Sequence, residues 1–173
     1  MTNIPPKADK TLEIARRTRK NLNFIYAAKN QGQDVEEFTQ LLNSMLGMLI
    51  SLKEDYFAGS HITWQKVKSM DLESWQRNLE ISGKVSSDLS PNLQKINSFS
   101  QLITKLRNAF AHNCFELLIG GNFNLITGVK VWNVPTGRPN TPRNRVWEAE
   151  IMENELKGLA YLFVEYLEKE LDP

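Results

Sequence analysis

Apolar side chains recur every three or four residues over most of the chain, a spacing that places them on one face of an α-helix. Five stretches carry this pattern, at about 8–30, 35–56, 64–83, 91–113 and 153–170. The second stretch has the widest apolar face, so we expect it to be the central helix of a bundle. The pattern therefore predicts a mainly helical protein.

The start of the fourth helix is indicated by Ser90 and Pro91. Serine is a favoured N-cap residue, and proline is well suited to the first helical position because its missing N–H has no partner there. From this point the apolar spacing continues through Ile96 and Phe99 to about Asn113. We therefore expect one long helix that leads into the second half of the chain.

Between the fourth and the last helix the pattern changes to that of β-strands. β-branched and other apolar residues fill 115–119 and 123–134, whereas 146–151 alternates between apolar and polar positions. The intervening residues 135–144 contain three prolines and a glycine, which predicts a loop.

Trp132 and Trp147 lie on either side of this loop, and we expect them to pair across the strands. No internal repeat or domain boundary interrupts the pattern. The sequence therefore predicts a single domain over residues 1–173, a helical bundle with a small β-hairpin inserted before the C-terminal helix.

Composition narrows the function classes. Hydrophobic residues make up 41% and charged residues 24%, as in an ordinary soluble globular protein. With a formal net charge of +1, any contact with nucleic acid must come from local basic patches. The single cysteine, Cys114, excludes an internal disulfide and a metal site with several cysteine ligands. No secretory signal or apolar run of about 20 residues is present, so we expect a cytoplasmic protein without membrane contact and without a cofactor.

The candidate chemistry lies in the segment from Leu106 to Asn113. It contains Arg107, Asn108 and His112, and His112 is one of only two histidines in the chain. On a helical wheel His112 lies next to Asn108, about 140° from Arg107, and away from the apolar face. An arginine can bind a phosphate, and a histidine can move a proton near neutral pH. Such spacing arises by chance in roughly a quarter of comparable chains, so an exposed histidine without a role remains an alternative.

At these residues the chain resembles the HEPN family (higher eukaryotes and prokaryotes nucleotide-binding). The family signature is an arginine, four to six further residues and a histidine, often with a polar residue directly after the arginine; Arg107 to His112 matches its shortest form. Family members are helical bundles with this motif near the end of a late helix. The hairpin and final helix are similar to a plasmid- and phage-associated bacterial subgroup. A glycine often follows the histidine, whereas this chain has Asn113.

The resemblance implies a metal-independent endoribonuclease that acts as a homodimer, in which two motif helices form one composite cleft. Arg107 would bind the scissile phosphate, and His112 would be the general base on the ribose 2′-hydroxyl or the acid on the leaving oxygen. Asn108 would orient the histidine or bind phosphate. By the same resemblance, the protein would be a toxin or anti-phage defence effector, with an antitoxin or regulatory protein as a possible partner.

Other basic residues are candidates for contacts with the RNA backbone. Lys105 shares a helix face with Asn108 and His112, and three arginines lie in the predicted loop and its C-terminal end, namely Arg138, Arg143 and Arg145. A solvent-exposed loop without such a role is the alternative. For the dense positive run at 16–20, a solvated helix face is the favoured interpretation.

Two further functions remain open from the sequence. The first is a catalytically silent HEPN-like module that binds RNA, nucleotide or a partner protein. The second is a structural dimerisation domain that uses the motif helix as its interface. Substitution of Arg107 would weaken binding in the first case and would change no nucleic-acid assay in the second.

Overall fold

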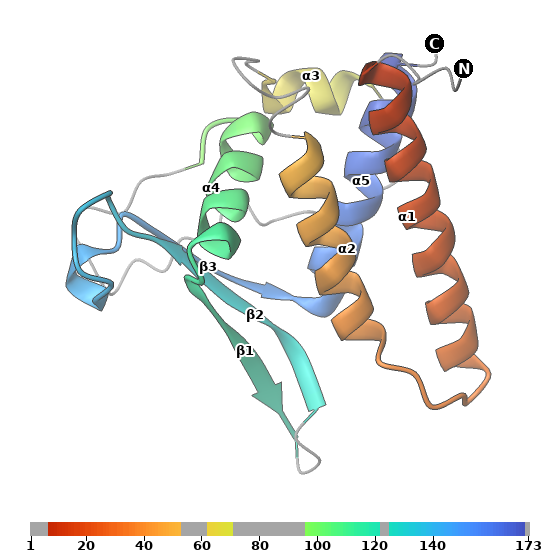
Figure 1. The fold of residues 1–173 in the computed structure, drawn as a ribbon, viewed down its shortest axis with the longest axis horizontal. Helices are drawn as coiled ribbons and strands as arrows, with labels where there is room; N and C mark the ends of the chain where they lie inside the picture. Colours follow the sequence, from red (N-terminus) through yellow and green to blue (C-terminus); the bar gives the residue numbers. More distant parts are fainter. Residues whose placement is uncertain (1–6, 53–61, 71–95, 122–124, 172–173) are drawn as a thin grey trace, which may run out of the picture.

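The computed structural model describes residues 7–52, 62–70, 96–121 and 125–171 of the chain. It is mainly helical, as the apolar spacing predicts, with a small antiparallel sheet (Figure 1). The helices are α1 (Lys7–Asn30), α2 (Glu37–Leu52), α3 (Trp64–Ser69), α4 (Phe99–Ala111) and α5 (Glu153–Leu171). The strands are β1 (Phe115–Gly120), β2 (Leu125–Asn133) and β3 (Trp147–Met152). No helix in these described ranges is both long enough and apolar enough to cross a membrane.

The helices pack around a shared apolar core. α1 contacts both α2 and α5, and α2 also contacts α4 (Figure 1). α4 contacts β2 of the sheet, and α2 and α5 contact the sheet as well. Phe99 of α4 is fully buried, and its ring centroid lies 5.8 Å from that of Tyr166 and 6.1 Å from that of Phe163, both on α5. These two tilted ring contacts fix the N-terminal half of α4 against α5.

The start of α4 differs from the prediction. Ser90 and Pro91 lie outside the described residues, but residues 96–98 are not helical, so the predicted continuous helix through Ile96 is wrong there. Ser98 is the N-cap, and its Oγ accepts a hydrogen bond of 3.1 Å from the backbone N–H of Gln101. Ser98 also forms a β-bridge with Thr63, and this long-range pairing holds the residues before α4 in an extended conformation.

The second and third predicted helices are tested only in part. The segment 53–56 at the end of the predicted second helix lies outside the described residues. The third helix begins at Trp64 as predicted and is described as far as Ser69, with Met70 as its C-cap. The remainder of that prediction, 71–83, also lies outside the described residues.

The sheet has three strands in the order β1-β2-β3, with both neighbouring pairs antiparallel. The three strands correspond to the three segments that the sequence predicts as strands, and because β3 pairs with β2 the predicted hairpin is part of a three-stranded sheet. The expected pairing of Trp132 with Trp147 is wrong, because Trp147 lies opposite Asn133 and Trp132 lies opposite Glu148. Adjacent register positions point to opposite faces of a sheet, so the two indoles are separated by the sheet itself.

Candidate active site

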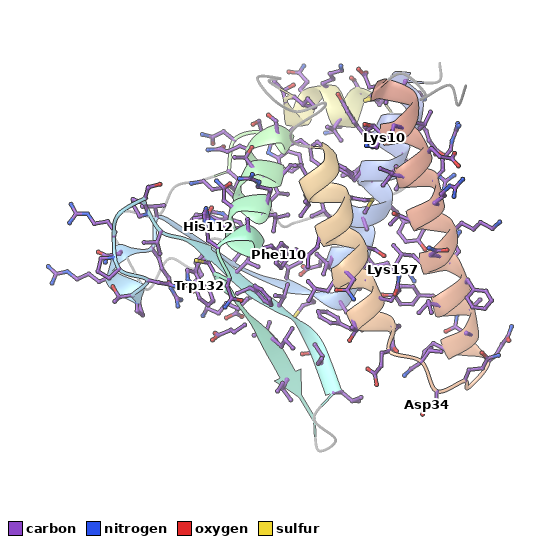
Figure 2. The ribbon with its side chains drawn as sticks, in the orientation of Figure 1. Lys10, Asp34, Phe110, His112, Trp132 and Lys157 are labelled. Atoms are coloured by element: carbon purple, nitrogen blue, oxygen red, sulfur yellow. The ribbon has the colours of Figure 1, made fainter. Side chains whose placement is uncertain are left out.

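The packing of α4 determines which of its side chains reach solvent. Leu106 and Ala109 are fully buried in the core, and Phe110 packs against Phe115 with ring centroids 5.3 Å apart. His112, at the same end of the helix, is exposed (Figure 2). The apolar face of α4 therefore turns the polar motif away from the core, as the helical wheel predicts.

The end of α4 positions His112, which is the C-cap residue. Asn113 follows with a φ of 52°, in the left-handed region that glycine occupies most readily. Its N–H donates to the carbonyl of Phe110 at 3.1 Å, and the N–H of Cys114 donates to the carbonyl of Ala109 at 2.7 Å. These two bonds form a Schellman motif. Asparagine tolerates this conformation better than other residues with a β-carbon, so Asn113 replaces the glycine that often occupies this place in the HEPN pattern.

The polar residues of the motif are linked to one another. Arg107 donates a hydrogen bond of 3.1 Å from Nη1 to Oδ1 of Asn108. Asn108 in turn lines a cleft together with His112 and Lys105. Arg107 does not line the cleft itself, but its guanidinium contacts Asn108, which does.

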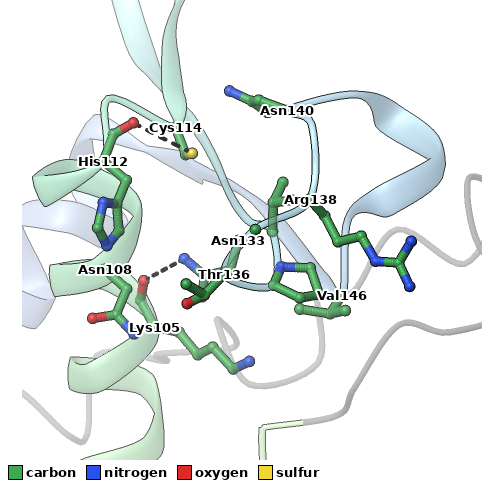
Figure 3. A pocket seen from close by; sticks show the side chains of 12 residues that line it. Lys105, Asn108, His112, Cys114, Asn133, Thr136, Arg138, Asn140 and Val146 are labelled. Carbon is green, nitrogen blue, oxygen red and sulfur yellow. Dashed lines mark hydrogen bonds between the residues drawn. The ribbon is translucent and has the colours of Figure 1, made fainter.

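We call this feature the α4 cleft. It has a volume of about 620 Å³ and lies between α4 and the loop that follows β2 (Figure 3). One wall comes from α4 and its C-terminal end, namely Lys105, Asn108, His112 and Cys114. The other wall comes from 133–138, Asn140 and Val146.

The loop that forms the second wall is held by several hydrogen bonds. The N–H of Arg138 donates to the carbonyl of Pro135 at 3.1 Å, in a turn where Gly137 has a φ of 80°. Farther along, the indole N–H of Trp132 donates to Oδ1 of Asn140 at 2.7 Å. Nδ2 of Asn133 donates to the backbone carbonyl of Lys105 at 3.0 Å and so joins the two walls (Figure 3).

Burial changes the acid–base behaviour of two groups in the α4 cleft. Lys105 is partly buried, which lowers the pKa of its ammonium group below the usual value. Burial raises the pKa of the Cys114 thiol, which donates a weak hydrogen bond of 3.5 Å to the carbonyl of His112. Cys114 is therefore suited to packing beneath His112 rather than to reacting as a thiolate.

The three arginines of the loop region lie in different environments. Arg138 is exposed and lines the α4 cleft, whereas Arg143 is exposed on the short 3₁₀ turn Pro142–Asn144 and does not line it. Arg145 is mostly buried, forms an ion pair with the buried carboxylate of Glu148, and lies 4.1 Å from the ring centroid of Trp132. The guanidinium of Arg145 therefore takes part in the packing of the sheet face.

The structure brings in residues that the sequence did not single out. Asn133 and the turn after it form one wall of the cleft, and Glu148 holds both Arg145 and Lys130, the latter at 3.0 Å. Asn133 ends β2 directly after the apolar pair Val131 and Trp132, which is a weak signal for a polar group with a specific partner. For Glu148 the only local signal is Arg145, three residues earlier, whereas Lys130 is brought close by the pairing of β2 with β3.

The positive run at 16–20 is engaged in ion pairs on the helix surface. Arg16 and Arg19 both contact Glu168 of α5, and Arg17 contacts Glu13 at 2.6 Å, one turn earlier. These contacts agree with a solvated, charge-compensated helix face.

Comparison with known proteins finds one family. A family model described as HEPN pEK499 p136 matches residues 1–173. No curated protein and no solved structure matches the chain.

Proposed function

Because the chain belongs to the HEPN pEK499 p136 family, we propose that it is a metal-independent endoribonuclease of the HEPN type. The observation that best supports this proposal is the grouping of Asn108, His112 and Lys105 along one cleft, with Arg107 hydrogen-bonded to Asn108. The group combines a proton carrier, a phosphate-binding guanidinium and a further cation. These are the parts that RNA cleavage through the ribose 2′-hydroxyl requires.

In the proposed reaction the 2′-hydroxyl oxygen attacks the adjacent phosphorus. A histidine removes the hydroxyl proton, the O2′–P bond forms, and the P–O5′ bond breaks as a second group donates a proton to the leaving oxygen. The products are a 2′,3′-cyclic phosphate and a 5′-hydroxyl. Arg107 stabilises the negative charge on the phosphoryl oxygens, and its hydrogen bond to Asn108 orients the guanidinium for that contact.

This chemistry accounts for the proposed homodimer. One motif contains one histidine, whereas the reaction needs a base and an acid at the same phosphate. A two-fold pair of α4 helices supplies both, together with two arginines. Ala111 is exposed beside His112, and its small side chain allows a second helix to approach closely.

Contacts with RNA outside the reacting phosphate are assigned to Lys105 and Arg138 in the α4 cleft and to Arg143 beyond it. Arg145 is a candidate for the same role from the sequence, but its guanidinium contacts Glu148 and Trp132, so we assign it a supporting role. We further propose that residues 1–173 form one domain and that the protein acts in the cytoplasm. A role as a toxin or anti-phage effector held by an antitoxin follows from family analogy alone.

A matched pair of oligonucleotides tests the proposed reaction. An RNA and a DNA of the same sequence, both labelled at the 5′ end, are incubated with the purified protein after its dimeric state has been measured by light scattering. We expect cleavage of the RNA only, and loss of each product band when a 2′-deoxynucleotide replaces the residue before the cut. Cleavage of the DNA or of the substituted RNA would refute attack by the 2′-hydroxyl.

A protein that binds RNA without cleaving it would give different results in these assays. A catalytically silent module would bind the RNA, lose affinity with Arg107→Ala, and yield no product with any RNA. A toxin role adds a cellular test: overexpression of the wild-type protein should arrest growth, and His112→Ala should relieve the arrest.

A further inference from the structure

The chemistry of the α4 cleft is that of a site for a small anionic ligand. Lys105 extends from the helix wall toward the loop, and Arg138 comes from the loop wall (Figure 3). None of the lining residues in the described part of the chain is an aspartate or glutamate. The volume of about 620 Å³ lies within the range of sites for small molecules and cofactors.

The cleft also contains a buried hydrogen-bond acceptor. Asn133 lines the cleft but is only 7% exposed. Its Nδ2 donates to the backbone carbonyls of Lys105 and Trp132, both at 3.0 Å, and these bonds determine which end of the amide is the oxygen. Among the described residues Oδ1 has no hydrogen-bond partner. Such a buried carbonyl oxygen is costly unless a donor is supplied, so its presence favours a ligand with an N–H group.

We propose that the α4 cleft is a subsite for one ribonucleotide of the RNA substrate, with the phosphate bound by Lys105 and Arg138 and the base read by Asn133. Nucleobases carry ring or exocyclic N–H donors, which suit the acceptor on Asn133. Val134, Pro135 and Val146 provide apolar contacts for the faces of the base. A nucleotide therefore supplies each kind of group that this cleft can bind.

The position of the subsite links it to cleavage. Asn108 and His112 line the same cleft as Asn133 and Arg138, so the bound nucleotide is next to the scissile phosphate. The inference rests on the proposed ribonuclease function and adds to it a source of base preference. Because one protomer provides both walls, the subsite binds a mononucleotide without completion by a second copy.

Mononucleotide binding tests this inference separately from cleavage. The four nucleoside 3′-monophosphates, the four nucleosides and inorganic phosphate are titrated into the full-length protein by isothermal calorimetry. We expect at least one nucleotide to bind more tightly than both its nucleoside and phosphate. Arg138→Ala should weaken that binding about tenfold, the effect of a lost charge-assisted hydrogen bond.

Arg143 provides the matched control. It is an exposed arginine of the same loop but does not line the cleft, so Arg143→Ala should leave mononucleotide affinity unchanged while it weakens binding of longer RNA. Equal losses with both variants would overturn the subsite, because they would indicate a diffuse electrostatic effect. Binding of phosphate as tight as that of every nucleotide would overturn it as well.

A second variant blocks the cleft without removing charge. Thr136 is exposed on the loop wall, so Thr136→Trp should fill the cleft while the protein remains folded, as checked by circular dichroism. We expect this variant to lose mononucleotide binding. Retained binding in the folded variant would refute the assignment. If Arg138→Ala and Thr136→Trp weaken mononucleotide binding as expected but RNA is not cleaved, the subsite is supported and the ribonuclease function is refuted. If RNA is cleaved but neither variant changes mononucleotide binding, the ribonuclease function is supported and the subsite is refuted.

Discussion

The backbone at Asn113 provides a quantitative test of how the end of α4 positions His112. The φ of 52° and the two Schellman hydrogen bonds require a left-handed residue at this position. For a residue with a β-carbon this conformation costs about 1–2 kcal/mol, most for a β-branched side chain and less for asparagine. Asn113→Val should therefore lower the free energy of unfolding by about 2 kcal/mol.

Asn113→Gly is the matched variant. Glycine adopts the same φ without strain, but it also gains freedom in the unfolded chain, so the two effects nearly cancel and the net change stays within about 1 kcal/mol. In a chain of 173 residues, 1 kcal/mol corresponds to a shift in Tm of roughly 2–4 °C. The valine variant should thus melt about 4–8 °C below the glycine variant.

Thermal unfolding followed by circular dichroism measures this difference, and RNA cleavage below the transition measures its effect on the site. We expect the glycine variant to retain activity, because the backbone of His112 keeps its position. The valine variant should lose activity even where it is folded, since its strain is relieved by moving the helix end. Equal melting temperatures for the two variants would refute the assigned helix end and the argument built on it.

Three further predictions follow from single contacts. Because burial lowers the pKa of Lys105, its proposed RNA contact should be lost as the pH rises through that lowered value, before an ordinary lysine deprotonates. Lys105→Met should bind RNA less tightly and lack this pH-dependent loss, and an unchanged pH profile of RNA binding would contradict the assignment. Arg145→Ala leaves the buried carboxylate of Glu148 with Lys130 as its remaining ion-pair partner, so it should lower the free energy of unfolding, measured by urea denaturation, by about 3 kcal/mol. The control Arg143→Ala, at an exposed arginine, should lower it by about 0.5 kcal/mol or less. Ser98→Ala removes the N-cap side chain of α4 and should lower the free energy of unfolding by about 1 kcal/mol. An unchanged urea midpoint would show that the Ser98 side chain does not stabilise the helix.

Much of the helical part of the fold could be predicted because it depends on local spacing. The apolar positions of α4 predict which face is buried, and the exposure of His112 beside the fully buried Leu106 confirms it. The first helix was predicted to within a residue of its observed bounds, Lys7–Asn30. Such agreement is expected where one amphipathic face decides the structure.

The remaining features depend on contacts between distant residues. Ser90 and Ser98 both precede helical sequence, and only the bridge from Ser98 to Thr63 indicates that the residues before Phe99 are extended. Arg145 resembles any loop arginine until the strand register places Trp132 opposite Glu148 and so beneath its guanidinium. These positions show where tertiary pairing overrides a local signal.

The α4 cleft could not be predicted for the same reason. Its walls are joined by the bond from Asn133 to the carbonyl of Lys105, across 28 positions of the chain. The sequence could single out Lys105 and His112 from their shared helix face, but it contained no indication that the loop after β2 would lie opposite them. A site assembled from one helix and one loop becomes visible only in the folded chain.

In the proposed reaction His112 cleaves RNA by using the 2′-hydroxyl and no metal ion. The most direct measurement is mass spectrometry of the RNA products formed in excess EDTA by the wild-type dimer and by folded, dimeric His112→Ala. We expect 2′,3′-cyclic phosphate and 5′-hydroxyl ends with the wild-type protein and no products with the variant. The same products at the same rate from His112→Ala, or no products from the wild-type dimer over varied RNAs, would contradict it.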